Sequence, residues 1–336
     1  MSLTVLRTRS EFNKLGQEWN QLLKKSASHV PFLRHEYLSS WWSTLGGGEW
    51  PSGELYVLLQ RAPDETLMGI APLFQHQNRL LLIGSYEISD YLDFIAPPEH
   101  LDAFSAAVVD HLAGAQNPDW EKLDLFNLQE TSPTIPALKK AAGRHSWEVK
   151  EEKLQPAPCL ELPESWEAYL DSLESRYRHE IERKLRRAES YFLPLDWYVV
   201  SRKADLEEEI QQFMELMAYN QEKAHFLTNS MVTQMKTTVQ EAFQAGWIQL
   251  AFLTVGDVKA AGYLNFDFQN RVYVYNSGLN PMFENISPGW VLLSYLIRQA
   301  IEDGRDSFDF MRGDETYKYR FGGTNRYVHR LQITRG

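Results

Sequence analysis

The stretch that decides the fold is Arg271–Phe321, which reads RVYVYNSGLNPMFENISPGWVLLSYLIRQAIEDGRDSFDFMRGDETYKYRF. Residues 272–275 are a run of β-branched and aromatic side chains, as in a central strand covered on both faces. Residues 290–302 then carry apolar side chains on one face of a helix, and residues 308–310 resume a strand. The order strand, loop, helix, strand predicts a mixed α/β domain with ionisable groups gathered after its last strand.

The helix in this stretch begins with three residues suited to binding an anion. Ser287 stands at the N-cap position, Pro288 at the first helical position, and Gly289 has no side chain to obstruct a ligand. A helix start also presents N–H groups that lack acceptors and the positive end of the helix dipole. We therefore predict that Ser287, Pro288 and Gly289 bind the phosphates of a cofactor.

Length and composition indicate a protein of two domains. The chain has 336 residues, a length that exceeds what one ordinary hydrophobic core accommodates. Hydrophobic residues make up 43% of it and aromatic residues 13%, so there is enough apolar surface to form two cores. The formal net charge of -11 argues against general nucleic-acid binding, because neutralising phosphates requires a basic surface. The histidines are scattered without the spacing of metal ligands, so we predict no metal.

The compartment is inferred from the N-terminus, the apolar runs and the single cysteine. MSLTVLRTRSEFNK lacks the apolar segment of a signal peptide, and no apolar run is long enough to span a membrane. Cys159 stands alone, which excludes an intramolecular disulfide and fits a reducing compartment. We predict a cytoplasmic protein without a transmembrane segment, in which Cys159 is a buried, unreactive thiol.

An internal repeat relates the two halves of the chain. Each half is expected to run helix, strand meander, loop, helix, strand and polar loop. We therefore predict two mixed α/β domains of one design, covering residues 1–152 and 153–336. The matching segments are Gly69–Phe74 with Gly262–Phe266, Gln77-Asn78-Arg79 with Gln269-Asn270-Arg271, and Leu123–Asn127 with Phe308–Arg312.

The whole pattern resembles the GNAT acyltransferase superfamily in its tandem form. More specifically, it resembles the BioF2-like, CelD-type acetyltransferases, whose relatives include the FemAB-type aminoacyltransferases. The usual GNAT pyrophosphate loop, Gln/Arg-x-x-Gly-x-Gly/Ala, is absent, and Asn285–Gly289 stands in its place. The resemblance implies a degenerate first GNAT-like domain and an active second one. It is carried by Ser89–Asp93, Arg176–Arg178 with the helix after it, Ser287–Gly289 and Asp309–Phe321.

This resemblance implies an acyl-CoA-dependent N-acyltransferase. Acetyl-CoA or another acyl-CoA is the expected donor, and an amine of a sugar, a metabolite or a cell-envelope precursor is the expected acceptor. The N–H groups near Asn276, Ser277 and Gly278 are expected to polarise the thioester carbonyl. Two alternatives remain open. One is a FemAB-like aminoacyltransferase that uses charged tRNA and a peptidoglycan precursor, and the other is a non-catalytic binding protein of polysaccharide biosynthesis.

The catalytic candidates follow the last strand of the opening stretch. Asp309, Asp314 and Glu315 are candidates for the base that takes a proton from the acceptor amine. Tyr317 or Lys318 is expected to protonate the leaving thiolate or to stabilise charge. The run Tyr-Lys-x-x-Phe-Gly is similar to Phe-Lys-x-x-Phe-Gly of the FemAB relatives, where the lysine lies in the active site. The alternatives are a buried, partnered acid for Asp309 and a surface ion pair for Lys318.

Three arginines are candidates for binding anions. Arg176 and Arg178 begin a basic helix and are predicted to contact the cofactor phosphates or an anionic acceptor. A solvated face of salt bridges is the alternative for this helix. Arg312 is expected to bind a carboxylate or phosphate through two parallel hydrogen bonds, or else to pair with Asp314.

The first half of the chain supplies the remaining candidates. Asp90, Tyr91 and Asp93 are predicted to form one wall of an acceptor cleft between the domains. Structural roles in a turn and a strand are the alternative for all three.

Overall fold

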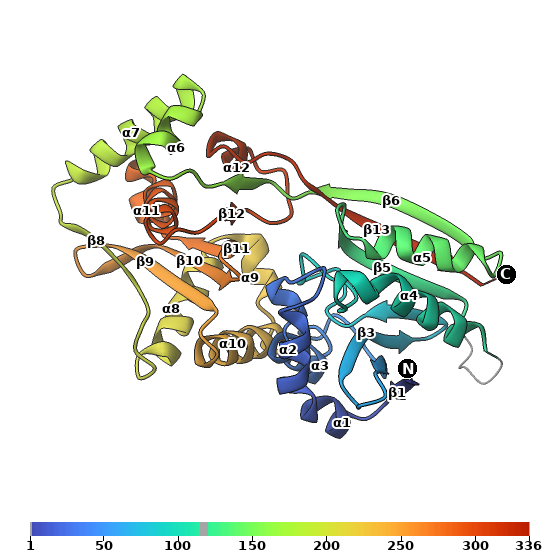
Figure 1. The fold of residues 1–336 in the computed structure, drawn as a ribbon. Coiled ribbons are helices and arrows are strands. Elements are labelled where there is room, and N and C mark those ends of the chain that lie inside the picture. The colour runs from blue at the N-terminus through green and yellow to red at the C-terminus, as the bar shows by residue number, and fades with distance from the viewer. Residues whose placement is uncertain (1, 115–119, 336) are drawn as a thin grey trace. The chain divides into compact units, whose positions relative to one another are not determined.

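The computed structural model describes residues 2–114 and 120–335, which form two compact units (Figure 1). The first unit consists of two segments, the residues up to Gln155 and those from Tyr327 onward. The second unit is continuous and spans Pro156–Arg326. The predicted division at residue 152 therefore differs in one respect, because the last strand belongs to the first unit. That strand, β13 (Tyr327–Thr334), pairs antiparallel with β5 (Lys122–Gln129).

The first unit is built on a seven-stranded sheet in the order β1-β2-β3-β4-β5-β13-β6. The strands β1 to β4 form an antiparallel meander, and β5 runs parallel to β4. Its remaining strands are β1 (Ser2–Leu6), β2 (Glu54–Arg61), β3 (Leu67–His76), β4 (Arg79–Leu82) and β6 (Glu148–Pro156). Its helices are α1 (Arg9–Lys14), α2 (Gly16–Leu23), η1 (Pro31–Leu33), α3 (His35–Thr44), α4 (Pro98–Ala113) and α5 (Thr134–Gly143).

The core of the first unit lies where β2 and β3 are covered on both faces. Six successive residues of each strand are buried, which is the pattern of a strand between two layers. Gly69 of β3 lets α4 approach closely, because a Cβ there would lie 2.6 Å from the Phe104 ring. The uninterrupted apolar runs therefore form the centre of the sheet.

The second unit has a six-stranded sheet in the order β7-β12-β11-β10-β9-β8. Its strands are β7 (Cys159–Glu161), β8 (Leu195–Val199), β9 (Ile248–Val255), β10 (Val258–Phe268), β11 (Arg271–Leu279) and β12 (Ser307–Asp309). Its helices are α6 (Trp166–Ser172), α7 (Ser175–Glu189), α8 (Leu206–Ala218), α9 (Gln221–Phe226), α10 (Asn229–Gln244), η2 (Pro281–Ile286), α11 (Pro288–Glu302) and α12 (Thr316–Arg320).

Both units repeat one topology. In the first unit β4 and β5 are parallel, with Leu81 opposite Asp124 and α4 between them in sequence. In the second unit β11 and β12 are parallel, with Tyr273 opposite Asp309 and α11 between them. The predicted mixed α/β fold with two domains of one design is therefore confirmed.

The parallel strands β11 and β12 of the second unit stop pairing after three residues. They pair only from Arg271 to Tyr273, because β12 ends at Asp309 while β11 continues to Leu279. Tyr275 is an extra residue of β11 relative to β10, and such a bulge bends and twists its strand. Among the described residues, β11 therefore has no strand paired with its β12 side beyond Tyr273, and this stretch is called its free edge below.

Two pairs of consecutive helices are each separated by a short non-helical break. Leu173 and Glu174 lie between α6 and α7 with backbone angles outside the helical region. Asn220 separates α8 from α9 and caps α9 by accepting a hydrogen bond from the Lys223 N–H. Within the described residues, no helix is long and apolar enough to cross a membrane.

Candidate functional site

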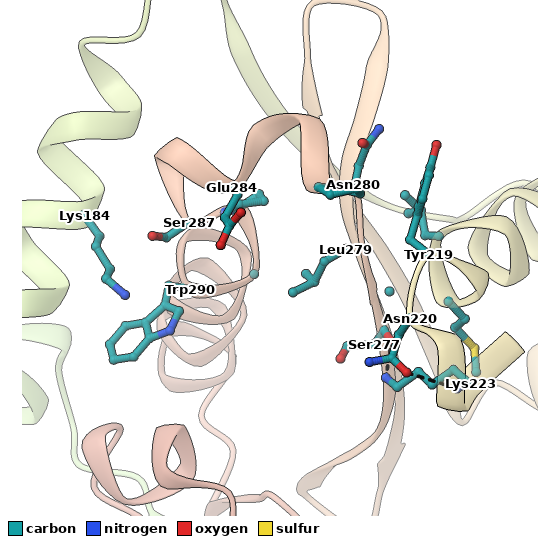
Figure 2. Close-up of a pocket in the computed structure, with 16 residues that line it drawn as sticks. Lys184, Tyr219, Asn220, Lys223, Ser277, Leu279, Asn280, Glu284, Ser287 and Trp290 are labelled. Atoms are coloured by element: carbon teal, nitrogen blue, oxygen red, sulfur yellow. Dashed lines mark hydrogen bonds between the residues drawn. The ribbon is translucent and has the colours of Figure 1, made fainter.

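A pocket of about 510 Å³ opens on the second unit where β11 passes the start of α11 (Figure 2). A volume of this size is in the range of small-molecule sites in proteins. The wall opposite α11 is formed by the end of α8 and the start of α9. The residues used below from its lining are Lys184, Tyr219, Asn220, Lys223, Ser277, Gly278, Leu279, Glu284, Ser287, Pro288, Gly289 and Trp290.

One wall of the pocket depends on Gly278, at which α8 packs directly against β11. A Cβ on Gly278 would lie 2.6 Å from the Leu216 carbonyl carbon and 2.6 Å from the Met217 nitrogen. Real side chains do not approach a backbone so closely, so only glycine fits. Gly278 thereby sets the distance between β11 and the segment that carries Tyr219, Asn220 and Lys223.

The start of α11 differs from the predicted N-cap. Ser287 has φ +54° and its side chain makes no capping hydrogen bond, although its position before the helix is as predicted. Pro288 has no N–H, and the N–H groups of Trp290 and Val291 both donate to the Ser287 carbonyl at 3.0 and 3.2 Å. Gly289 is the remaining donor of this turn. The helix start thus offers fewer donors to a diphosphate than the sequence led us to expect.

A lysine from α7 supplies positive charge beside this helix start. The Lys184 ammonium lies 3.5 Å from the centre of the Trp290 ring and 3.4 Å from a Glu180 carboxylate oxygen. Burial lowers the pKa of Lys184, while Glu180 raises it. Nothing in the sequence marks Lys184 as functional. It lies beside Ile181 and Leu185, which belong to the apolar face of α7.

The predicted anion-binding arginines point elsewhere. Arg176 pairs with Glu174 at 2.8 Å and stacks on the Tyr177 ring, and it is mostly exposed. Arg178 pairs with Asp171 and Glu182. Neither lines the pocket. The solvated face of salt bridges, given above as the alternative, describes both arginines, and Lys184 is the residue of this helix that reaches the pocket.

On the opposite wall stands Lys223, in the first turn of α9. Its ammonium donates to the Asn276 side-chain oxygen at 2.9 Å and to the Ser277 carbonyl. Burial lowers the pKa of Lys223, while the nearby Glu315 carboxylate raises it. Figure 2 shows Lys223 beside Asn220 and Ser277. The sequence signal for it was the capping pattern Asn220-Gln-Glu-Lys223, which marks a helix start but not a functional side chain.

The predicted row of N–H groups on β11 is partly occupied. The Ser277 N–H donates to the Asn276 side-chain oxygen at 2.9 Å. Gly278 faces α8 across the close contact described above. The prediction that Asn276, Ser277 and Gly278 present open N–H groups to a carbonyl is therefore corrected for Ser277, because the side chain of Asn276 takes that donor.

Of the three carboxylates, Asp309 lies in the core and the other two lie on the surface. Asp309 is fully buried, and its Oδ1 accepts a hydrogen bond from the Met311 N–H at 2.8 Å. Asp314 is exposed. Glu315 is also exposed and lies 2.8 Å from the Lys318 ammonium. Its electrostatic contact with Lys223 places Glu315 near the pocket.

Lys318 is a buried lysine that ties down a loop. It is 2% exposed, and its ammonium donates to the carbonyls of Met311, Arg312 and Gly313 at 3.1, 2.6 and 3.4 Å. An ammonium has three protons, and these acceptors together with Glu315 account for all of them. The alternative given above, a surface ion pair, is right about the partner Glu315 and wrong about the surface, because the Lys318 side chain is buried. Because the Arg312 carbonyl accepts one of these hydrogen bonds, the backbone of Arg312 is fixed within the loop 311–315.

Tyr317 and Tyr263 are close neighbours in the second unit. The Tyr263 hydroxyl donates to the Gly289 carbonyl at 3.3 Å. Burial raises the pKa of the Tyr317 phenol well above its ordinary value, and Tyr263 and Glu315 raise it further. Tyr317 therefore holds its proton at neutral pH, as a proton donor must.

The candidates of the first unit are largely internal to it. Asp93 is 2% exposed and its carboxylate accepts hydrogen bonds from the hydroxyls of Ser28 and Ser132. Tyr91 is equally buried and packs against the Phe32 ring. The structural alternative describes Tyr91 and Asp93, because neither presents its polar group to the surface. Asp90 is half-buried and remains a candidate for substrate binding.

The reactivity of the Cys159 thiol tests whether this side chain is buried in the second unit as the structure shows. It is 1% exposed, and burial together with the neighbouring Asp309 carboxylate raises the pKa of its thiol to about 12. Because a thiol reacts as the thiolate, we expect no modification of native protein by a disulfide reagent at pH 8, and one equivalent after unfolding. Rapid modification of the native protein would contradict this placement.

Comparison with known proteins gives the class. Residues 175–319 match the family model described as an acetyltransferase (GNAT) domain. No curated protein matches the chain by sequence. This segment contains the pocket, the start of α11 and the parting of β11 from β12. Residues 175–319 are therefore similar to a GNAT acetyltransferase domain, which supports an acyltransferase.

Solved structures extend the likeness from that segment to the whole chain. FemX has a TM-score of 0.64 at 11% identity, covering 98% of this chain and 97% of that one. The L-PGS structure from Bacillus licheniformis has a TM-score of 0.57 at 11% identity, covering 95% and 91%. A tandem GNAT protein of the clavulanic acid pathway has a TM-score of 0.50 at 12% identity, covering 100% and 99%. The chain therefore shares its overall fold with these three structures.

Proposed function

We propose that the protein transfers an acyl group from acyl-CoA to an amine. The observation that carries this proposal is the pocket at the free edge of β11, which has a lysine on each of two walls and a helix start between them. An elongated donor with a phosphate end and a carbonyl end fits such a pocket, because each end meets a cation or an N–H donor.

The phosphate end of the donor is assigned to the α11 side of the pocket. Gly289 offers an N–H and no side chain, and the Lys184 ammonium adds the charge that the helix start lacks. Lys184 is held over the Trp290 ring, so it is positioned before a ligand arrives. Pro288 and Ser287 shape this end, and Arg176 and Arg178 have no part in it.

The chemical end of the donor is assigned to the region between β11 and α12. The acceptor amine must lose a proton to attack the thioester, and Glu315 is the carboxylate best placed to take it. Tyr317 is the proposed donor to the departing thiolate, because its phenol is protonated at neutral pH and lies near the Glu315 carboxylate. Lys318 and Asp309 are assigned to holding the loop 311–315 in place, and Asp314, Arg312 and Asp90 remain candidates for contacting the acceptor.

The acceptor is proposed to be an amine of a sugar, a metabolite or a cell-envelope precursor. An aminoacyl-tRNA donor is the competing proposal, and the net charge of -11 weighs against it. Calorimetry separates the two donors. Binding of acetyl-CoA or a longer acyl-CoA supports our proposal, whereas binding of aminoacyl-tRNA without binding of any CoA species overturns it.

Gly289→Glu tests the assigned phosphate end. The new carboxylate would stand beside the helix start, and its Cβ would lie 2.8 Å from the Leu279 side chain. We expect CoA affinity to fall by about 100-fold, since like charges at an interface cost several kcal/mol. The matched control is Gly143→Glu in the first unit, where a Cβ would meet no atom within 4 Å. Equal CoA affinity in both variants would contradict the assignment.

A further inference from the structure

We propose that Lys223 is a catalytic residue, whose ammonium polarises the donor's thioester carbonyl and stabilises the oxyanion that forms on it. This inference rests on the proposed transfer from acyl-CoA and names a further member of the same site. It replaces the open N–H group of Ser277 that the sequence led us to expect.

The first observation is that the strand edge has lost a donor. The Ser277 N–H, one of the donors that the sequence led us to expect for the thioester carbonyl, follows the bulge of β11 and donates to the Asn276 side chain at 2.9 Å. A thioester oxygen placed there would need another hydrogen-bond donor. The same Asn276 oxygen that occupies the N–H also accepts from Lys223 at 2.9 Å. We therefore assign hydrogen-bond donation to the thioester oxygen to the Lys223 ammonium in place of the Ser277 N–H.

The second observation is that the Lys223 ammonium has more N–H donors than the acceptors seen for it. Its ammonium carries three N–H bonds, and the acceptors seen for it among the described residues are the Asn276 side chain and the Ser277 carbonyl. Lys223 lines the pocket. The two protein acceptors hold the ammonium in a fixed place, which leaves its third N–H for a ligand.

The third observation concerns how the lysine is held. Asn220 accepts a hydrogen bond from the Lys223 backbone N–H at 3.1 Å, which fixes the first turn of α9. Gly278 brings α8, and with it this segment, against β11. The position of Lys223 is therefore set by two independent contacts, as preorganised stabilisation of charge requires.

The charged form of Lys223 is supported by its surroundings. Burial lowers the pKa of Lys223, and the groups that face it, the Asn276 and Ser277 oxygens and the Glu315 carboxylate, oppose this by favouring the ammonium. A cation that is partly removed from water interacts more strongly with a developing negative charge than an exposed one does. Partial burial of Lys223 thus increases its effect on the carbonyl.

The lone pair of the acceptor nitrogen forms a bond to the thioester carbon, and the carbonyl π pair moves to oxygen, where Lys223 stabilises it. Glu315 takes one proton from the nitrogen. The oxygen pair then re-forms the carbonyl, the carbon–sulfur bond breaks, and the departing thiolate takes a proton from Tyr317. The products are an amide and CoA. The proton taken by Glu315 replaces the one given by Tyr317, and Lys223 ends the cycle as it began.

The experiment compares Lys223→Met and Lys223→Arg with wild type, using acetyl-CoA as donor and CoA as a ligand without the carbonyl. Lys223→Met is expected to lower kcat by about 100- to 1,000-fold, the usual effect of losing one oxyanion donor. The Kd of CoA should stay within about threefold, since a uniform binding contact is not removed. Lys223→Arg keeps the charge and should recover part of kcat. Lys236→Met is the matched control, because Lys236 pairs with Glu207 outside the pocket.

Three results would overturn the inference. A Lys223→Met enzyme with kcat near wild type would show that the ammonium does not touch the reacting carbonyl. A parallel loss of kcat and CoA affinity would make Lys223 a binding or structural residue. A Lys223→Arg enzyme as inactive as Lys223→Met, with CoA affinity intact, would indicate a base in place of an electrophile. Failure of wild type to bind any CoA species would instead remove the proposed function itself.

Discussion

Replacing Lys318 with methionine is expected to lower the free energy of unfolding by about 3–5 kcal/mol, the usual cost of removing one partner from a buried ionic cluster. The ammonium holds three carbonyl oxygens of the loop 311–313 and is 2% exposed. Methionine fills the space but donates no hydrogen bond. Those carbonyls would then lose this donor, and the loop that carries Glu315 would lose the side chain that holds it in place. Urea denaturation of the two proteins measures the difference.

Lys203→Met is the control for this prediction, because Lys203 is exposed. Its substitution should change stability by no more than about 0.5 kcal/mol, as surface changes usually do. The same measurements also separate two roles for Lys318. A variant that keeps its stability and loses only turnover would identify Lys318 as a group acting on the substrate, contrary to the structural role assigned above.

The second large effect is expected for Gly278→Ala, which should cost about 3 kcal/mol of stability, the upper end for overpacking. The added Cβ would lie 2.6 Å from backbone atoms of Leu216 and Met217. The clash involves backbone atoms, which cannot move aside by a change of rotamer. It is therefore relieved only if α8 shifts away from β11. That shift would widen the pocket wall and move Lys223, so donor binding should weaken together with stability.

Gly143→Ala is the matched control for the same chemical change. A Cβ on Gly143 meets no atom within 4 Å, and this glycine ends α5. Removing backbone freedom there should leave stability unchanged or raise it by up to about 1 kcal/mol. Thermal unfolding of both variants tests the pair. A Gly278→Ala protein as stable as Gly143→Ala would mean that α8 does not press on β11.

The fold was predictable where the pattern is local. Residues 272–275 and 290–302 carry their strand and helix signals in their own side chains, and β11 and α11 lie there. The repeat between Gly69 and Gly262 located two equivalent strands, β3 and β10. By contrast, the pairing of β13 with β5 joins segments about two hundred residues apart. No local pattern records such a partner, and the domain boundary was therefore placed differently at the end of the chain.

The site was predictable in position and less so in its chemistry. Ser287–Gly289 marked the correct helix start, but the sequence does not reveal that two N–H groups of the turn are taken by one carbonyl. Lys184 and Lys223 escaped notice, since a lysine on a helix flank looks the same whether it faces water or a pocket. Lys318 was found through its motif, yet only the structure shows that its ammonium points inward.

The place of β13 has a consequence for how the protein is made. In the first sheet β13 lies between β5 and β6, although residues 156–326 separate it from β6 in the chain. During synthesis, β6 emerges from the ribosome long before the strand that joins it to the sheet. The N-terminal unit must therefore wait, incomplete and with an uncovered strand edge, until the whole acyltransferase unit has been translated. Assembly of the two units is coupled in time, because the nascent chain supplies the closing strand last.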